Sequence, residues 1–288
     1  MLFDSHAHLN NEDYTEAQRR TLVAEIENSD VTYVADIGFN LESSAMAAKH
    51  AEQYPWCYAA VGFHPHDAKE MTDQDLALLK SLAKKPKVMA IGETGLDFYR
   101  DISPRDVQRD CFRKQIRLAN ELKMPIVVHA READQETMDI LKEEQAFSTE
   151  RTGWFPRREG QPDARVLLHC FSGSRETALQ YVKLGATISI AGPVTYKNAR
   201  KLVEVAVAIP IGALLIETDT PYLTPEPHRG KRNRPPYVAY TARKIAEIRE
   251  TSYEEVARVT CENAKRFYGI EDGVRTRCTK HHSGTPAD

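Results

Sequence analysis

The sequence has 288 residues, of which 41% are hydrophobic and 28% are charged, and its formal net charge is −3. These values are typical of a soluble globular protein with one large domain or two small ones. They give no overall basic signal, so a nucleic-acid partner would have to be held by a local patch or a metal site.

Apolar, β-branched runs alternate with amphipathic segments along the chain. The predicted strands are Leu2–His8, Val31–Asp36, Trp56–Phe63, Val88–Glu93, Ile126–His129, Val166–His169, Ala186–Ile190 and Ala213–Glu217. The predicted helices are Glu16–Asn28, Leu41–Gln53, Asp73–Leu82, Arg105–Leu122, Ala133–Glu144, Arg175–Lys183, Asn198–Val207, Tyr237–Arg249, Tyr253–Thr260 and Cys261–Tyr268. Such alternation implies parallel strands joined by crossover helices.

Strand–helix units in this number, within about 250 residues, fit a closed (β/α)8 TIM barrel. An open doubly wound sheet is the alternative, but it usually begins with a glycine-rich turn, and the first turn here reads His6–Asn11. The polar segment Arg151–Arg165 is interpreted as a long surface loop. Residues 1–270 are expected to form the barrel, and residues 271–288 a polar, disordered tail. Its His281-His282 pair would bind metal weakly or have no function, and the second is expected.

The chain shows no feature of a secreted or membrane protein. Its first twenty residues carry several charges without an apolar core, unlike a signal peptide. The longest weakly charged stretch, Val205–Ile216, is interrupted by Pro210 and falls short of the about 20 residues that span a bilayer. The five cysteines are scattered and form no Cys-x-x-Cys pair, which favours a reducing cytoplasm.

Histidines and carboxylates stand where the predicted strands end. They are His6 and His8 at the first strand, His64 after the third, Glu93 at the fourth, His129 at the fifth, His169 at the sixth and Asp219 after the eighth. One such residue alone is more often a satisfied core residue. The repetition is hard to obtain by chance, and in a barrel these ends converge on one mouth, where active sites lie.

The residue types at these positions predict metal binding. His6 and His8 alternate with Ala7, so both imidazoles share one face of the strand. The imidazoles and carboxylates together exceed the ligand set of one tetrahedral metal. They suit two divalent ions about 3.5–4 Å apart with a bridging carboxylate. Mixed nitrogen and oxygen ligands leave zinc, manganese, iron and magnesium possible.

Five motifs in order carry a resemblance to a known family. They are Asp4–Leu9, Gly62–His66, Gly92–Asp97, His169–Gly173 and Glu217–Asp219. Together they resemble the TatD family of metal-dependent deoxyribonucleases, within the amidohydrolase-like superfamily, from Leu2 to about Ile270. The resemblance implies a barrel hydrolase that cleaves DNA, often from a 3′ end. It also implies that one ion is held by His6, His8, Glu93 and Asp219, and a second by Glu93, His129 and His169, with Glu93 bridging.

Phosphodiester hydrolysis gives the remaining polar residues candidate roles. Asp219 would accept the proton of the attacking water, serve as a metal ligand, or do both. His64 and Arg131 would contact phosphate, although a salt bridge at a helix start explains Arg131 equally well. Asp97 would orient a metal ligand from behind or cap the next segment.

A basic loop follows Asp219. Arg229, Lys231, Arg232 and Arg234 lie within six positions, where they would guide a nucleic-acid backbone or form an ordinary solvated surface. The TatD family usually has Asn-Glu-Pro at the end of this segment, and this chain has Arg234 in place of the glutamate. That departure leaves open any role of the usual glutamate.

Three functions are compatible with this pattern. The leading interpretation is a two-metal nuclease acting on DNA, with RNA as the alternative substrate, and without an obligate protein partner. A second is an amide or ester hydrolase of the same superfamily, such as a D-aminoacyl-tRNA deacylase, although many amidohydrolases carry a modified lysine where this chain has Glu93. A third is a non-enzymatic metal-binding scaffold, which predicts loss of ligands, yet the whole predicted ligand set is present.

Overall fold

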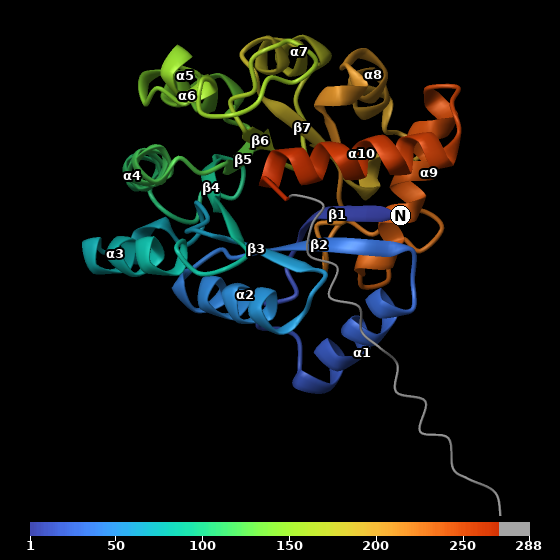
Figure 1. Cartoon of the computed structure of the whole chain (residues 1–288), viewed down its shortest axis with the longest axis horizontal. Coiled ribbons are helices and arrows are strands. Elements are labelled where there is room, and N and C mark those ends of the chain that lie inside the picture. Colours follow the sequence, from blue (N-terminus) through green and yellow to red (C-terminus); the bar gives the residue numbers. More distant parts are fainter. Residues whose placement is uncertain (271–288) are drawn as a thin grey trace, which may run out of the picture.

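In the computed structural model, residues 1–270 are described, and they form eight parallel strands surrounded by helices (Figure 1). The strands are β1 (Leu2–Ala7), β2 (Val31–Ile37), β3 (Cys57–Val61), β4 (Val88–Asp97), β5 (Ile126–Arg131), β6 (Val166–Leu168), β7 (Thr187–Ile190) and β8 (Leu214–Ile216). Their order in the sheet is their order in the chain, and neighbouring strands are parallel. This confirms the predicted (β/α)8 TIM barrel. The predicted tail, 271–288 with His281 and His282, lies outside the described residues.

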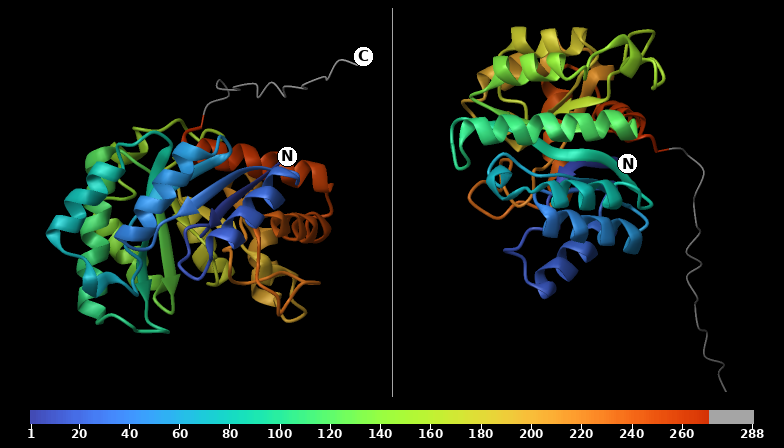
Figure 2. Two further views of the ribbon diagram at one scale, coloured as in Figure 1. Left: turned by 90° about the horizontal axis from the view of Figure 1, so that it is seen from below. Right: turned by 90° about the vertical axis from the view of Figure 1, so that its left-hand side faces the viewer.

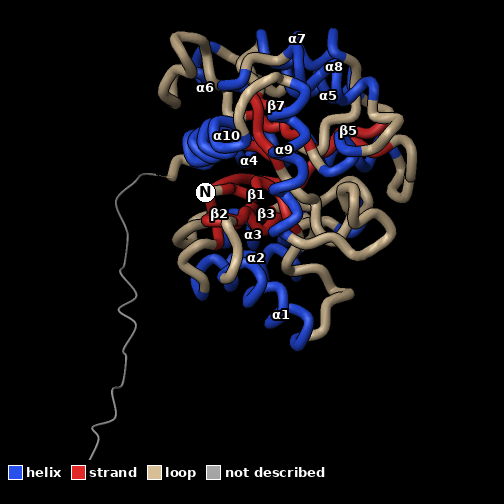
Figure 3. The backbone as a smooth tube through the Cα atoms, turned by 90° about the vertical axis from the view of Figure 1, so that its right-hand side faces the viewer, coloured by secondary structure: helices blue, strands red, loops and turns tan. Residues whose placement is uncertain are grey.

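The helices form the outer layer of the barrel (Figure 3). They are α1 (Glu16–Glu27), α2 (Leu41–Gln53), α3 (Asp73–Leu82), α4 (Arg105–Leu122), α5 (Asp134–Glu143), α6 (Thr149–Thr152), α7 (Arg175–Lys183), α8 (Arg200–Ala208), α9 (Val238–Ile248) and α10 (Tyr253–Tyr268). Short 3₁₀ turns lie at Ala68–Glu70, Gly192–Thr195, Ile211–Ala213 and Pro235–Tyr237. None of the helices in residues 1–270 combines the length and apolar character needed to cross a bilayer.

The last helix corrects the sequence prediction. Two helices were expected over Tyr253–Thr260 and Cys261–Tyr268, whereas α10 is continuous. No glycine or proline lies between its N-cap, Ser252, and its left-handed C-cap, Gly269, so nothing in the sequence breaks it.

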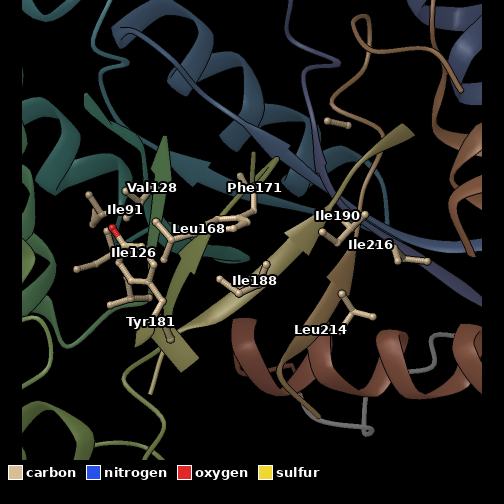
Figure 4. Packing of buried hydrophobic residues seen from close by; sticks show 14 of the residues in the cluster. Ile91, Ile126, Val128, Leu168, Phe171, Tyr181, Ile188, Ile190, Leu214 and Ile216 are labelled. Atoms are coloured by element: carbon tan, nitrogen blue, oxygen red, sulfur yellow. The ribbon is translucent and has the colours of Figure 1, made fainter. Parts of the chain in front are cut away.

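Strand side chains alternate between two apolar cores. The outer core lies between the strands and the helices and includes Leu168, Ile188 and Ile190 (Figure 4). The inner core fills the barrel and includes Phe3 of β1 and Phe267 of α10. Because α10 lies beside the N-terminal end of β1 (Figure 2), it closes that end of the barrel and leaves the C-terminal ends of the strands as the mouth.

The seam between β8 and β1 closes through specific polar contacts. The carboxylate of Asp4 accepts hydrogen bonds from the backbone N–H and the hydroxyl of Thr218, at 2.8 and 2.6 Å. The backbone N–H of Asp219 donates to His6 O at 2.9 Å. The seam thus joins the strand that bears His6 to the segment that bears Asp219.

The segment Arg151–Arg165 forms the predicted loop over most of its length, with no helix or strand after α6 and with residues 156, 157 and 159–161 exposed, but its first residue is an anchor. It begins within α6, and Arg151 is fully buried. The guanidinium of Arg151 donates to Ala164 O, Asn120 Oδ1 and Met124 O at 2.7–2.9 Å. These bonds satisfy a buried cation, and the polar composition of the loop did not predict that Arg151 is buried.

Replacement of Arg151 tests this anchoring role. Arg151→Met keeps the length of the side chain but leaves buried acceptors without donors, so we expect the free energy of unfolding to fall by about 3 kcal/mol. The control is Arg157→Met in the same segment, where the side chain is exposed and the loss should stay below about 0.5 kcal/mol. Urea denaturation measures both, and equal losses would contradict the anchoring role.

Candidate metal centre

The predicted ligand residues meet at the C-terminal mouth of the barrel. His6 lies in β1 and His8 directly after it, Glu93 lies in β4, His129 in β5, His169 directly after β6, and Asp219 after β8. Loops gather at this side of the barrel, away from the N-terminus (Figure 3). The side chains of His6 and Glu93 are 0% and 3% exposed, so the centre lies within the mouth rather than on its rim.

Glu93 was predicted to end the fourth strand, but β4 continues to Asp97. Gly92 and Gly95 flank Glu93 with φ values of 143° and 142°, which side chains rarely adopt. A Cβ at Gly95 would lie 2.0 Å from His129 O, so only glycine permits this approach of β4 to β5. The pairing of the two strands is irregular between Ile91 and Thr94, and this irregularity turns Glu93 into the mouth.

The two carboxylate oxygens of Glu93 face two different groups of histidines. Oε1 lies 2.8 Å from His169 Nε2 and 3.0 Å from His129 Nδ1. Oε2 lies 3.3 Å from His6 Nε2 and 3.4 Å from His8 Nε2. Glu93 therefore stands between two sets of nitrogen donors.

Asp219 borders the group that contains His6 and His8. Its Oδ1 lies 3.5 Å from His8 Nε2 and 3.8 Å from His6 Nε2. Asp219 has φ 57°, a left-handed conformation that aspartate tolerates, and its backbone is tied to His6 O. Burial by itself would raise the pKa of Asp219, but the contact with His8 and the nearby imidazoles hold it below its usual value.

In His8 and His129, the ring nitrogen that points away from the centre has a hydrogen-bond acceptor. That acceptor determines that the other ring nitrogen, which faces the centre, carries the lone pair of the neutral ring. His8 Nδ1 lies 2.8 Å from Ile37 O, which can only accept a hydrogen bond. His129 Nε2 lies 3.2 Å from Asp97 Oδ2. Neutral His8 therefore presents the lone pair of Nε2 to the centre, and neutral His129 presents that of Nδ1.

His64 turns a proton, rather than a lone pair, toward the centre. The backbone N–H of His66 donates to His64 Nδ1 at 3.1 Å, so this nitrogen must carry the lone pair. The proton of neutral His64 is on Nε2, which lies 3.4 Å from Glu93 Oε1. Burial lowers the pKa of His64 to about 4, which keeps the ring neutral at pH 7. The spacing of His64, Glu93 and His129 would suit a metal ion, but the tautomer makes His64 a hydrogen-bond donor.

The spacing of the other donors fits divalent ions. His6 Nε2 and His8 Nε2 are 3.2 Å apart, and His129 Nδ1 and His169 Nε2 are 3.3 Å apart. Two nitrogens bound to one tetrahedral ion at about 2.0–2.1 Å would be separated by about 3.3 Å. Each histidine pair therefore has the separation that a shared ion requires.

Of the residues predicted to contact phosphate, His64 lies in this cluster, whereas Arg131 and the basic loop lie outside it. Arg131 is exposed at the end of β5, with its guanidinium 4.1 Å from the centre of the Tyr99 ring. In the basic loop, Arg234 forms an ion pair with Glu25 of α1, and the guanidinium of Arg232 lies 4.8 Å from the centre of the Tyr14 ring. These two loop arginines thus contact the protein itself.

Asp97 and Glu217 lie behind the histidines. Asp97 Oδ2 contacts His129, as noted above, and its Oδ1 accepts the backbone N–H of Tyr99 at 3.0 Å, so Asp97 contacts a candidate ligand and also caps the segment after β4. Glu217 received no role from the sequence, although it is fully buried 3.4 Å from His169 Nδ1. The sequence feature that could have indicated a role is the position of this carboxylate directly after the apolar residues of the eighth strand.

Comparisons with known proteins identify the family of the chain. The model of the family described as TatD related DNase matches residues 3–269. The chain belongs to the TatD family. It is 45% identical over 270 residues to the metal-dependent hydrolase YabD of Bacillus subtilis, which covers 94% of this chain and 100% of YabD. The resemblance drawn from the five motifs is thereby confirmed.

Two further relatives place the chain within the TatD family. A Citrobacter koseri protein named 3′-5′ ssDNA/RNA exonuclease TatD is 35% identical over 239 residues, covering 81% of this chain and 86% of that protein. The solved structure of the Escherichia coli TatD homologue YjjV matches with a TM-score of 0.82 and 25% identity, covering 94% of this chain and 98% of that one. This TatD family member is a metal-dependent hydrolase.

Metal uptake by this TatD family member is expected to release protons. Burial would lower the pKa of His8, but contacts with Asp219 and Glu93 raise it to about 9. A ligand imidazole must be neutral, so at pH 7 metal must displace this proton. The imidazolium form competes below its pKa, and therefore the apparent affinity should rise by about tenfold per pH unit per displaced proton up to about pH 9.

Titration calorimetry in buffers of different ionisation enthalpy counts these protons. We expect at least about one proton per protein at pH 7, and fewer in His8→Ala. His228→Gln is the control, because His228 stacks on Tyr237, outside the centre, with ring centroids 4.2 Å apart. A binding enthalpy that does not depend on the buffer would contradict the protonation of His8.

Proposed function

We propose that this protein is a two-metal phosphodiesterase that removes nucleotides from the 3′ ends of single-stranded DNA or RNA. The observation that carries the proposal is the division of the Glu93 carboxylate between two groups of histidines. One ion would be held by His6, His8, Glu93 and Asp219, and the other by Glu93, His129 and His169. The name of the Citrobacter koseri relative supports the substrate and the direction of digestion.

The residues of the centre divide the work of phosphodiester hydrolysis. Bound divalent ions would neutralise phosphate charge and make a water more acidic. Asp219 lies at the edge of the donor set with a low pKa, so its ionised carboxylate is available to accept the proton of the attacking water. His64 presents a neutral Nε2–H, which would donate to a phosphoryl oxygen as charge develops there.

Residues around the mouth would contact the rest of the nucleic acid. Arg131 is exposed beside Tyr99, itself 56% exposed, and this pair offers a cation for phosphate and a ring for a base. Because the net charge is −3, such local groups must supply the attraction. The scattered cysteines favour a cytoplasmic location for the activity.

The decisive experiment compares substrate classes with one preparation of protein. Metal-stripped protein is reloaded with Mg²⁺, Mn²⁺, Zn²⁺ or Fe²⁺ and incubated with 5′-labelled single-stranded DNA, duplex DNA, RNA and an aminoacyl ester. A ladder of shortened single strands with a retained 5′ label is expected. Preferential cleavage of the ester would favour the amide or ester hydrolase, and no turnover with any metal would favour the scaffold.

Asp219→Asn tests proton transfer. The amide keeps the size and an oxygen ligand but cannot accept the proton, so kcat should fall by on the order of 10²–10⁴ while metal content stays largely intact. Metal analysis and kinetics at rising metal concentration separate the two roles. Recovery of activity at saturating metal would reduce Asp219 to a ligand, and near-normal kcat at modest metal would exclude both roles.

His64 and His129 form a matched pair of variants, since both rings contact Glu93 Oε1. His64→Ala should leave metal content unchanged and lower kcat/KM by about 10²–10³, because a donor to the phosphoryl oxygen is lost. His64→Gln restores an N–H donor and should recover part of the activity. His129→Ala should instead lower metal content. Loss of metal from His64→Ala would show that His64 is a ligand.

A further inference from the structure

A histidine that binds metal through one nitrogen needs an acceptor for the N–H on the other. That acceptor fixes the tautomer and the orientation of the ring. For His8 it is Ile37 O, and for His129 it is Asp97. His6 and His169 are the two remaining candidate ligands, and they belong to different metal sites in the proposed function.

The far nitrogens of His6 and His169 are buried beside one carboxylate, that of Glu217. Within the described residues, His6 Nδ1, His169 Nδ1 and Glu217 Oε2 are buried without a hydrogen-bond partner of good geometry. His6, His169 and Glu217 each bring a donor or acceptor atom within 4.8 Å of the other two. Glu217 Oε1 is 3.4 Å from His169 Nδ1. His6 lies within 4.8 Å of Glu217, farther than His169 does. A buried carboxylate is costly without donors. Oε1 of Glu217 already accepts a backbone N–H, so Oε2 is the oxygen without a donor, and the two unpaired Nδ1 atoms lie beside this carboxylate.

The two rings are also held against each other. Their centroids are 3.8 Å apart and their planes differ by 11°. Each ring directs Nε2 toward the Glu93 carboxylate, to Oε2 from His6 and to Oε1 from His169. One carboxylate behind this stack can therefore serve a ligand of each metal site.

We infer that Glu217 is a positioning residue that accepts the Nδ1–H groups of His6 and His169 and so couples the two metal sites from behind. Glu93 would join the two sites as a shared ligand, and Glu217 would join them through the orientation of two ligand rings. Removal of Glu217 should therefore weaken both sites together. The inference rests on the proposed ligation by His6 and His169.

Glu217→Gln separates this role from a purely structural one. Glu217 Oε1 also accepts the backbone N–H of Cys170 at 2.6 Å, and the carbonyl oxygen of glutamine can keep that bond. The amide loses the charge and one acceptor, so affinity for both ions should fall by about 10–100-fold. Saturating metal should restore kcat. In the zinc-loaded wild-type protein, proton NMR should show protected imidazole N–H signals of His6 and His169 that exchange with solvent faster in Glu217→Gln.

Titration calorimetry with Zn²⁺ alone measures the affinities and the number of ions, and circular dichroism checks the fold. Glu204→Gln is the control, because Glu204 is exposed in α8, where it pairs with Arg200. Unchanged affinities, weakening of one site only, or three ions in wild type against two in Glu217→Gln would each overturn the inference. His169→Ala distinguishes the two proposals: if it binds metal normally, the proposed function fails as well.

Discussion

The structure depends on placing one carboxylate, that of Glu93, inside the mouth of the barrel. A buried carboxylate needs partners that offset its lost hydration, and here imidazoles from separate strands supply them. Burial would raise the pKa of Glu93, but the surrounding histidines hold it well below its usual value. A buried carboxylate that remains ionised and has imidazole nitrogens on both sides is suited to bind cations.

At the seam between β8 and β1, the contacts that close the barrel also bring together residues of the centre. There, the carboxylate of Asp4 accepts hydrogen bonds from Thr218. The backbone N–H of the next residue, Asp219, donates to His6 O. A barrel that failed to close would separate His6 from Asp219, although both strands could still form. The first strand and the segment after the eighth therefore supply the contacts that close the barrel. They also supply His6, His8 and Asp219, which with Glu93 would hold one ion in the proposed function.

The strand pattern and the positions of the ligands could be predicted because both are local. Apolar runs predict strands, and parallel strands of a barrel bring their C-terminal ends to one mouth. Contacts between distant segments were not predictable. The glycines beside Glu93 act through the backbone of β5, and Arg151 is buried only because its acceptors lie on other segments. The sequence assigned Glu217 no role, because its contact with His169 joins residues that are distant in sequence.

The histidines of the mouth have the same side chain, and their surroundings give them different chemistry. A carbonyl behind His8 and a carboxylate behind His129 turn a lone pair toward the centre. An N–H behind His64 turns a proton toward it instead. In the proposed function the centre would both bind cations and donate to a phosphate, and these two tasks need both kinds of ring. The hydrogen-bonding group behind each ring determines whether that ring turns a lone pair or a proton toward the centre. The number of histidines in the sequence does not reveal this difference.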